Sequence, residues 1–451
     1  MEEQIEQEIV RPGSYVVVQK QNFRKLCKVS EKGTFTLGKE QIEMEQLIGK
    51  CYWSTFKMIP SKNGKKNITL ILAEKAETSE ELRKGVTSGI DNRSITDDGT
   101  SQKLSREEIE DLREAGKSSN EIVGCLIENS TSFASKTEYS QEKYIKKKEN
   151  KYFRYLTILK PSIAILQAIY FRQDHSKINC LRMDTLSQIL SFCDVKADGQ
   201  YILYDGGSCG LAAAALMSRI GSETKGNLIH LHPGNQAQMT LVHAMNFPDE
   251  QLKRMHTVNL YTFLRLYHQG ENVIIDELAK KYALSRKLAN DVKRKNNDED
   301  ENNLNIKRPK FEDSSMKADE LIVHEDNKID DTTSLVGTFK MPRWFDETRE
   351  AVNRIKQSVT QGLAIIGREH PLNIINELLS FLGASRPFVI YHCHREPLQE
   401  TYVALKQRKD IINLKLFSNF CRGYQVLHNR THPDIMTNDL GGYLLTGYLV
   451  I

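Results

Sequence analysis

Helical and strand-like segments alternate from residue 177 to residue 267, and this alternation constrains the fold more than any other feature. The stretch "CLRMDTLSQILSFCDV" has helical periodicity, and "QYILYD" after it is typical of a buried strand. A second helix, "GLAAAALMSRIG", and a second strand, "GNLIHLHPG", follow. Strands that are separated by helices pair in parallel, with helices on both faces of the sheet. The sequence therefore predicts a doubly wound α/β domain.

This alternation is interrupted and then resumes. Residues 284–338 are rich in Asn, Asp, Glu and Lys and poor in aromatics, which is typical of a disordered insertion. Beyond it, "GLAIIG", "NIINELLSFLG", "PFVIYHCH" and "EPLQETYVALKQ" continue the pattern, and we expect "RGYQVL" and "GGYLLTGYLV" to pair as the last strands. One Rossmann-like domain would thus comprise residues 176–283 and 339–451.

The chain before this domain divides into two parts. Short β-branched and aromatic runs between residues 12 and 75 predict a β-rich barrel over residues 1–80. Within it, we expect Tyr52, Trp53 and Phe56 to pack in the core, with RNA stacking as the alternative. Residues 81–175 would form a helical extension, because capping boxes begin at Ser105 and Ser118 and a charged helix follows them. The fold class is therefore α/β, with a barrel domain before a Rossmann-like domain.

Composition excludes several classes of protein. The net charge is only +4, so any surface that binds nucleic acid must be local. Eight cysteines are present without a CxxC pair, which argues against a disulfide framework or a cysteine zinc site. His392 and His394 have a spacing that zinc accepts, but two further ligands are missing, so we predict no metal site.

The loop after the strand "QYILYD" resembles the cofactor loop of a class I methyltransferase. Such a loop has an acid followed by glycines at alternate positions, which let the backbone approach S-adenosylmethionine. Here Asp205 and Gly207 match, but Cys209 and Leu211 replace the second and third glycines. We therefore interpret the loop as degenerate.

Two further positions support this interpretation. A carboxylate at the end of the next strand would hold the ribose hydroxyls, but His230 or His232 lies there, and an imidazole cannot accept both bonds. The third strand ends in Gly367, Arg368 and Glu369, and Glu369 lies two residues past the position expected for a base. We therefore predict no catalytic residue and no cofactor in this chain.

A basic helix is the main candidate for RNA binding. The stretch "EKYIKKKENKYFRY" combines aromatics with cations that can neutralise phosphates. The alternative is an ordinary solvated helix face. Arginines that flank strand ends near the face of the cofactor loop are further candidates, with strand capping or subunit contact as alternatives. The predicted RNA-binding residues are Lys143, Lys146, Lys147, Lys148, Lys151, Arg154, Arg386, Arg395, Arg422 and Arg430.

Nearly the whole chain resembles the non-catalytic subunit of the eukaryotic tRNA (adenine-58-N1) methyltransferase. The most specific stretch is residues 91–148, which begin "DNRSITDDGTSQKLSREEIEDLREAGKSSNE", and "SRPFVIYHCHREPLQETY", "HNRTHP" and "GGYLLTG" add to the resemblance. The resemblance implies a tRNA-binding role beside a catalytic sister subunit in an α2β2 heterotetramer, with S-adenosylmethionine bound only in the sister. In this comparison Gly367 takes the place of the sister's catalytic aspartate.

Other functions and the cellular location remain open at this stage. The alternatives are an independent S-adenosylmethionine-dependent RNA methyltransferase with a divergent loop and a general RNA-binding scaffold. The basic clusters "VKRKNN" and "IKRPKFED" resemble a bipartite nuclear import signal, and the family role also implies the nucleus.

Overall fold

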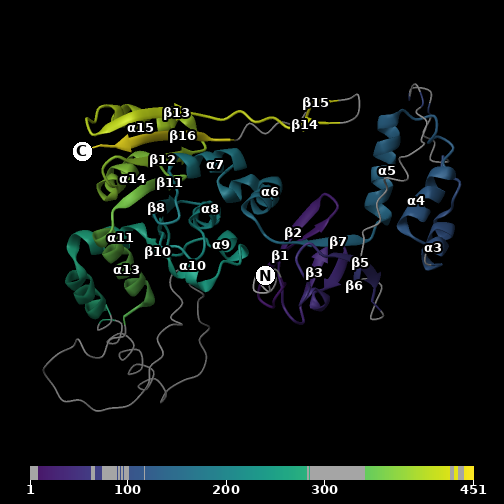
Figure 1. Cartoon of the computed structure of the whole chain (residues 1–451), viewed down its shortest axis with the longest axis horizontal. Helices are drawn as coiled ribbons and strands as arrows, with labels where there is room; N and C mark the ends of the chain where they lie inside the picture. The colour runs from purple at the N-terminus through teal and green to yellow at the C-terminus, as the bar shows by residue number, and fades with distance from the viewer. Residues whose placement is uncertain are drawn as a thin grey trace, which may run out of the picture.

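The computed structural model describes residues 9–61, 67–73, 89, 92, 95, 101–115, 117–281, 284, 341–426, 431–434 and 441–450. Apart from residue 284, the expected insertion lies outside these residues, and so does Arg430. The described residues form an N-terminal sheet, a group of helices beside it and a larger C-terminal domain (Figure 1). No helix in the described part is long and apolar enough to cross a membrane.

Within the described residues, the N-terminal sheet has seven strands in the order β2-β1-β7-β5-β6-β4-β3. Its edge strands β2 and β3 approach each other, because Lys25 donates from Nζ to the Thr36 carbonyl oxygen at 2.8 Å. This nearly closed sheet confirms the predicted β-rich barrel. The strands are β1 Tyr15–Lys20, β2 Phe23–Lys28, β3 Thr34–Leu37, β4 Glu40–Glu43, β5 Thr55–Pro60, β6 Asn67–Ala73 and β7 Tyr155–Leu159.

One strand of this sheet comes from the segment that we assigned to the helical extension. Strand β7 pairs with β1 through Val17 and Leu159 and with β5 through Phe56 and Leu156. Phe56 and Leu156 are each only 1% exposed and belong to the core of this sheet. The N-terminal sheet is thus completed by a strand that lies beyond the helices.

The helical group between β6 and β7 has the predicted caps. Ser105 and Glu108 exchange both bonds of a capping box, with the Ser105 N–H donating to Glu108 at 2.7 Å. Ser118 and Glu121 form the second box. Gly116, which the sequence predicts as the end of the first helix because glycine is typical of helix C-termini, lies outside the described residues. The helices are α3 Arg106–Glu114, α4 Ser119–Glu128 and α5 Glu138–Tyr152.

Seven strands of the described residues form the C-terminal sheet, in the order β10-β9-β8-β11-β12-β16-β13. Numbered along the chain within this sheet, the spatial order is 3-2-1-4-5-7-6, and only β16 runs antiparallel to its neighbours. The predicted Rossmann-like fold is therefore confirmed. The strands are β8 Gln200–Asp205, β9 Asn227–His232, β10 Met255–Asn259, β11 Thr360–Ile366, β12 Arg386–His392, β13 Ile411–Phe417 and β16 Tyr443–Leu449.

Helices cover both faces of this sheet, as Figure 1 shows. Because side chains alternate along a strand, Leu203 of β8 packs in one core and Ile202 in the other. The first core contains helices α6 Ile163–Asp174, α7 Met183–Phe192 and α8 Leu211–Ile220. The second contains α11 Leu260–Gln269, α13 Arg343–Gln357, α14 Pro371–Leu378 and α15 Arg395–Lys406. The short helices α9 Thr240–Ala244 and α10 Asp249–Lys253 connect β9 with β10.

The predicted pairing of the last two strands is wrong. Strand β16 pairs with β12 and β13, whereas β14 Tyr424–Gln425 pairs with β15 His432–Pro433. The segment "GGYLLTGYLV" instead takes the sixth position across the sheet, between β12 and β13, where this apolar strand is buried on both sides. The short β14–β15 pair projects from the end of the sheet (Figure 1).

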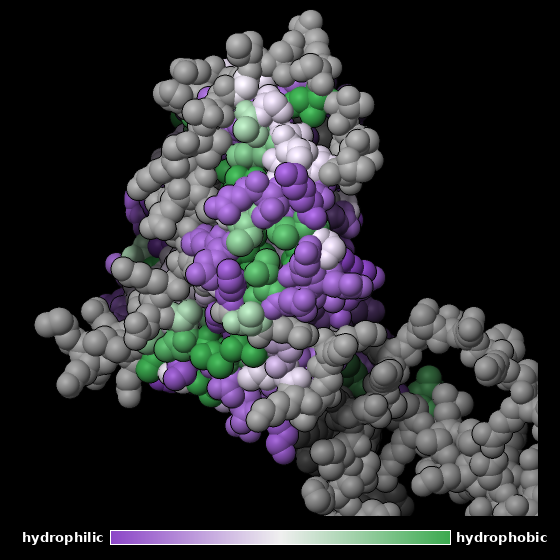
Figure 2. Space-filling view, turned by 90° about the vertical axis from the view of Figure 1, so that its right-hand side faces the viewer, coloured by the Kyte–Doolittle hydropathy of each residue, from purple (hydrophilic) through white to green (hydrophobic). Residues whose placement is uncertain are grey.

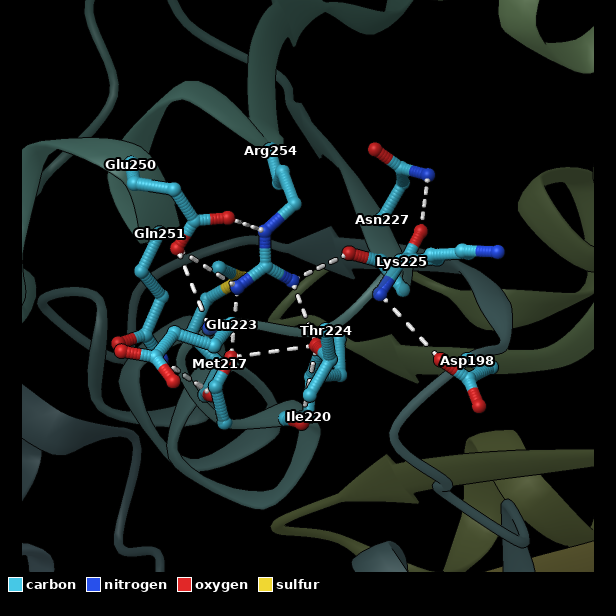
Figure 3. A network of polar contacts seen from close by, with 12 residues as sticks. Asp198, Met217, Ile220, Glu223, Thr224, Lys225, Asn227, Glu250, Gln251 and Arg254 are labelled. Carbon is cyan, nitrogen blue, oxygen red and sulfur yellow. Dashed lines mark hydrogen bonds and ion pairs between the residues drawn. The ribbon is translucent and has the colours of Figure 1, made fainter.

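Side-chain bonds hold the amino edge of the C-terminal sheet. Arg254 donates to the Gly221 carbonyl oxygen at 2.6 Å and to the Gly226 carbonyl oxygen at 2.7 Å. It also forms an ion pair with Glu250 at 2.7 Å, and the Lys225 ammonium points away from this network (Figure 3). Arg254 therefore fixes the connection between α8 and β9, and Lys225 is left at the surface.

Candidate functional site

The loop between β8 and α8 is held together by Asp205. This carboxylate is 7% exposed, and its Oδ1 accepts the Gly207 N–H at 3.1 Å and the Ser208 N–H at 2.8 Å. Its Oδ2 accepts the Ser208 hydroxyl. Since both oxygens are bonded to donors of the same loop, Asp205 acts as an internal cap of the turn into α8.

The glycines of this loop make room for side chains of the protein itself. A Cβ atom at Gly206 would lie 2.5 Å from Oε2 of Glu369. A Cβ atom at Gly207 would lie 3.0 Å from Nε of Arg368. The Arg368 guanidinium is fixed there, because it also donates to the Ser176 carbonyl oxygen. Arg368 and Glu369 thus lie against the loop from the end of β11.

The two residues that replace the motif glycines have different environments. Cys209 has a φ of 55°, a left-handed conformation that is uncommon outside glycine, and its thiol contacts Gln238 Oε1 at 3.5 Å. Burial and then the charge of Asp205 raise the pKa of the Cys209 thiol. Leu211 is fully buried in the core as the first residue of α8. Of these two residues, only Cys209 is therefore partly exposed at the surface of the loop.

Histidines occupy the end of β9, as the sequence predicts. His230 is buried, and its Nε2 lies 3.9 Å from Oδ2 of Asp205 without a hydrogen-bond partner among the described residues. Burial lowers the pKa of His230 to about 4, although the nearby Asp205 charge opposes this shift. Burial also lowers the pKa of His232. Both imidazoles are therefore neutral near pH 7.

The end of β11 has a carboxylate, but this carboxylate is bonded within the protein. Burial and the neighbouring Glu369 carboxylate raise the pKa of Tyr204, whose hydroxyl bonds to Glu369. The Arg368 N–H donates to Glu369 Oε2 at 3.2 Å. At Gly367, a Cβ atom would lie 3.3 Å from the Tyr204 ring, so a side chain fits poorly there. Glu369 thus contacts the β8–α8 loop from the end of β11.

The histidines of "YHCHRE" are joined to each other rather than arranged around a common point. The His394 N–H donates to Nδ1 of His392 at 3.0 Å, and His392 Nε2 lies 3.4 Å from the Arg368 carbonyl oxygen. Within the described ranges, no three His, Cys, Asp or Glu side chains form a group that fits a metal ion.

Helix α5 presents a row of exposed lysines opposite its buried side. The buried residues are Gln141, Ile145 and Tyr152. Four lysines are exposed and form what we call the lysine stripe, which consists of Lys143, Lys146, Lys147 and Lys151. The Lys151 ammonium also lies 5.1 Å from the centre of the Tyr152 ring. Because positions three and four apart share a helix face, these ammonium groups form one continuous positive surface.

Two of the predicted cations outside the lysine stripe have other contacts. The Lys148 ammonium lies 5.0 Å from the centre of the Tyr144 ring, and burial followed by two neighbouring lysines lowers its pKa. Arg154 forms an ion pair with Glu40 of β4. These two residues therefore contribute less free charge to the surface than the lysine stripe does.

The structure does not bring the four predicted arginines together. Arg395 is exposed at the start of α15, at the carboxyl edge of the sheet where Arg368 also lies. Arg386 begins β12 and therefore lies at the opposite, amino edge, so its predicted place near the loop is wrong. Arg422 is exposed in the projecting segment before β14, and Arg430 lies outside the described residues.

One exposed aromatic was expected in the core. Tyr52 and Phe56 are buried as predicted, but Trp53 is 61% exposed. Its φ of 72° breaks the strand pattern before β5, so the alternation of buried and exposed residues shifts at this point. The stretch "CYWSTF" contains no glycine, proline or asparagine that would predict this turn from the sequence.

The fold and the site together define a class of protein. A sheet in the order 3-2-1-4-5-7-6 with one antiparallel strand, and a helix that starts after an acid and glycines at the end of its first strand, characterise a Rossmann-like methyltransferase domain. The chain belongs to the Gcd10p family, whose model matches residues 9–311.

Similar proteins cover nearly the whole chain. The tRNA (adenine(58)-N(1))-methyltransferase non-catalytic subunit TRM6 of Mus musculus is 33% identical, over 98% of this chain and 88% of that protein. The protein of the same name from Dictyostelium discoideum is 28% identical, over 97% of this chain and 79% of that protein. The crystal structure of tRNA (m1A58) methyltransferase TrmI from Aquifex aeolicus matches with 9% identity and a TM-score of 0.43, over 98% and 99% of the two chains.

Proposed function

We propose that this chain is the non-catalytic subunit of a tRNA (adenine(58)-N(1))-methyltransferase and that it binds tRNA beside a catalytic subunit. The observation that carries this proposal is that Asp205 is bonded to donors of its own loop. The chain also resembles non-catalytic TRM6 subunits over nearly its whole length. The role of the chain is then to position the substrate.

The residues at the strand ends do not fit S-adenosylmethionine. The acid that would face the ligand is bonded inside the loop, and Arg368 and Glu369 lie against the loop glycines. At the end of β9, a neutral imidazole replaces the carboxylate that would accept bonds from both ribose hydroxyls. We therefore propose that the methyl donor binds only in the catalytic subunit.

We propose that the lysine stripe contacts the tRNA backbone. Exposed lysines on one helix face can each neutralise a phosphate and release a counterion. Arg395 and Arg422 are exposed and remain candidates for the same role, whereas Arg386 and the ion-paired Arg154 are weaker ones. The assembly into an α2β2 heterotetramer and the location in the nucleus are parts of the same proposal.

Reconstitution tests the function directly. Each chain alone should leave a tRNA transcript unmodified or nearly so, and the mixture should methylate adenosine 58. Isothermal titration of this chain alone with S-adenosylmethionine should give no heat of binding. Methylation or micromolar donor binding by this chain alone would instead identify an independent methyltransferase. Tight tRNA binding without assembly with the catalytic subunit would identify a general RNA-binding scaffold.

A further inference from the structure

Trp53 is a large aromatic side chain that is held at the surface. It is 61% exposed, whereas the neighbouring Tyr52 is 8% exposed. The Trp53 N–H donates to the Ile158 carbonyl oxygen of β7 at 2.6 Å, so the backbone of this residue is fixed to the sheet. An exposed indole on a fixed backbone loses little conformational freedom when a flat ring stacks on it.

Trp53 lies just before β5, and further along β5 the solvent-facing side of β5, β6 and β7 combines aromatic, apolar and cationic side chains. In the register of the sheet, Tyr155 of β7 lies opposite Lys57 of β5, and Lys57 lies opposite Ile71 of β6. Lys57 is exposed and Ile71 is 53% exposed, while Phe56 on the other face is buried. We call Trp53, Lys57, Ile71 and Tyr155 the outer sheet face.

This outer sheet face continues into the lysine stripe. Lys151 lies in the last turn of α5, and β7 begins with Tyr155 only a few residues later. The Met58 N–H donates to the Arg154 carbonyl oxygen at 2.8 Å, which ties the end of α5 to β5. Figure 2 views the molecule from the side of α3 to α5, where apolar areas lie beside hydrophilic ones.

We propose that the outer sheet face and the lysine stripe form one binding surface for an unpaired segment of the tRNA, in which a base stacks on Trp53. This inference rests on the proposed function, because it names the residues that would contact the RNA. Stacking platforms beside rows of cations are how proteins bind single-stranded nucleic acid without reading sequence. The positive charge beside the apolar residues favours RNA over an apolar protein partner.

The chain has only two tryptophans, Trp53 and Trp344, which permits a direct test. In the Trp344→Phe variant, 5-fluorotryptophan labels position 53 alone, and the labelled chain is assembled with an unlabelled catalytic subunit. Addition of a tRNA transcript should shift the single fluorine resonance. Trp53→Ala should weaken tRNA affinity about 10-fold, and Trp53→Phe should restore most of the affinity. Tyr261→Ala, which removes a 68% exposed aromatic from α11, is the matched control and should change affinity less than twofold.

The possible outcomes distinguish a failure of the stacking surface from a failure of the proposed function. If tRNA binds but the resonance and the affinity of Trp53→Ala are unchanged, the stacking surface is refuted while the proposed function stands. If the complex does not bind tRNA at all, the proposed function fails as well. If the resonance shifts on assembly with the catalytic subunit and not with tRNA, this face is a subunit contact and the inference is overturned.

Discussion

The salt dependence of tRNA binding is the sharpest test of the lysine stripe. The variant replaces Lys143, Lys147 and Lys151 by alanine, because these three lysines lie one turn apart on the exposed face of α5. None of them lies on the buried side of the helix, and alanine has the highest helix propensity. The variant should therefore fold normally and lose three positive charges, together with the contact between the Lys151 ammonium and the Tyr152 ring.

The expected size of the effect follows from counterion release. If each lysine contacts one phosphate, the slope of log K against log[salt] should become shallower by about 2 to 3. Between 50 and 200 mM salt, the complex with the unaltered chain should then lose about 20- to 40-fold more affinity than the variant complex. Lys148→Ala should have a smaller effect, because Lys148 is half-buried over the Tyr144 ring.

The assay is fluorescence anisotropy of a labelled tRNA transcript with the assembled complex at several salt concentrations. The control variant replaces Lys225, Lys253 and Lys409, three exposed lysines that precede strands at the amino edge of the C-terminal sheet. It has the same net charge as the test variant. Equal slopes for the two variants would show that only total charge matters and would refute a specific contact by α5.

Three further predictions concern the β8–α8 loop. Asp205→Ala should lower the stability of the chain by about 3 kcal/mol in urea denaturation, because buried donors lose their charged acceptor. Methylation per assembled complex should stay within twofold of that of the unaltered complex. A selective rise in the KM for S-adenosylmethionine would contradict the absence of a donor at Asp205. Burial lowers the pKa of His230 from 6.5 to about 4, so the unfolded chain gains its proton first as the pH falls. Up to about 3 kcal/mol of stability should therefore be lost between pH 6.5 and pH 4. His230→Gln should lose less stability over this range, and an equal loss would exclude His230 as the cause. Arg368→Gly, which clears the guanidinium from Gly207, should not create donor binding in isothermal titration, since Asp205 remains bonded.

The sequence predicted the C-terminal domain well because its elements are long and strongly patterned. The strand "QYILYD" is buried on every residue, and such runs between helices have few other interpretations. Strand β4, Glu40–Glu43, has a single β-branched residue, the buried Ile42, among charged and amide side chains, so the sequence pattern does not predict it. Strand β7 was missed because its partners β1 and β5 lie far away in the sequence, and no local signal identifies them.

The residue types at the site could be predicted from the sequence, but the contacts between these residues could not. The loss of motif glycines at Cys209 and Leu211 follows from spacing alone. The contacts of Gly206 and Gly207 with Glu369 and Arg368 depend on β8 and β11 being neighbours in the sheet. Arg386 was misplaced for a related reason, because its side of the sheet depends on where β12 begins.

The β8–α8 loop has the shape of a binding site, but its polar groups are already paired. A ligand that bonded to Oδ1 of Asp205 would have to displace the N–H groups of Gly207 and Ser208, and each bond to a buried carboxylate contributes about 1.5 to 3 kcal/mol. A loss of about 3 kcal/mol weakens binding by about 100-fold or more, so a micromolar ligand would become a submillimolar one. The free energy of these bonds stabilises the domain in the absence of any ligand. The groups that we propose for recognition are therefore exposed ones elsewhere, the lysines of the lysine stripe and Trp53.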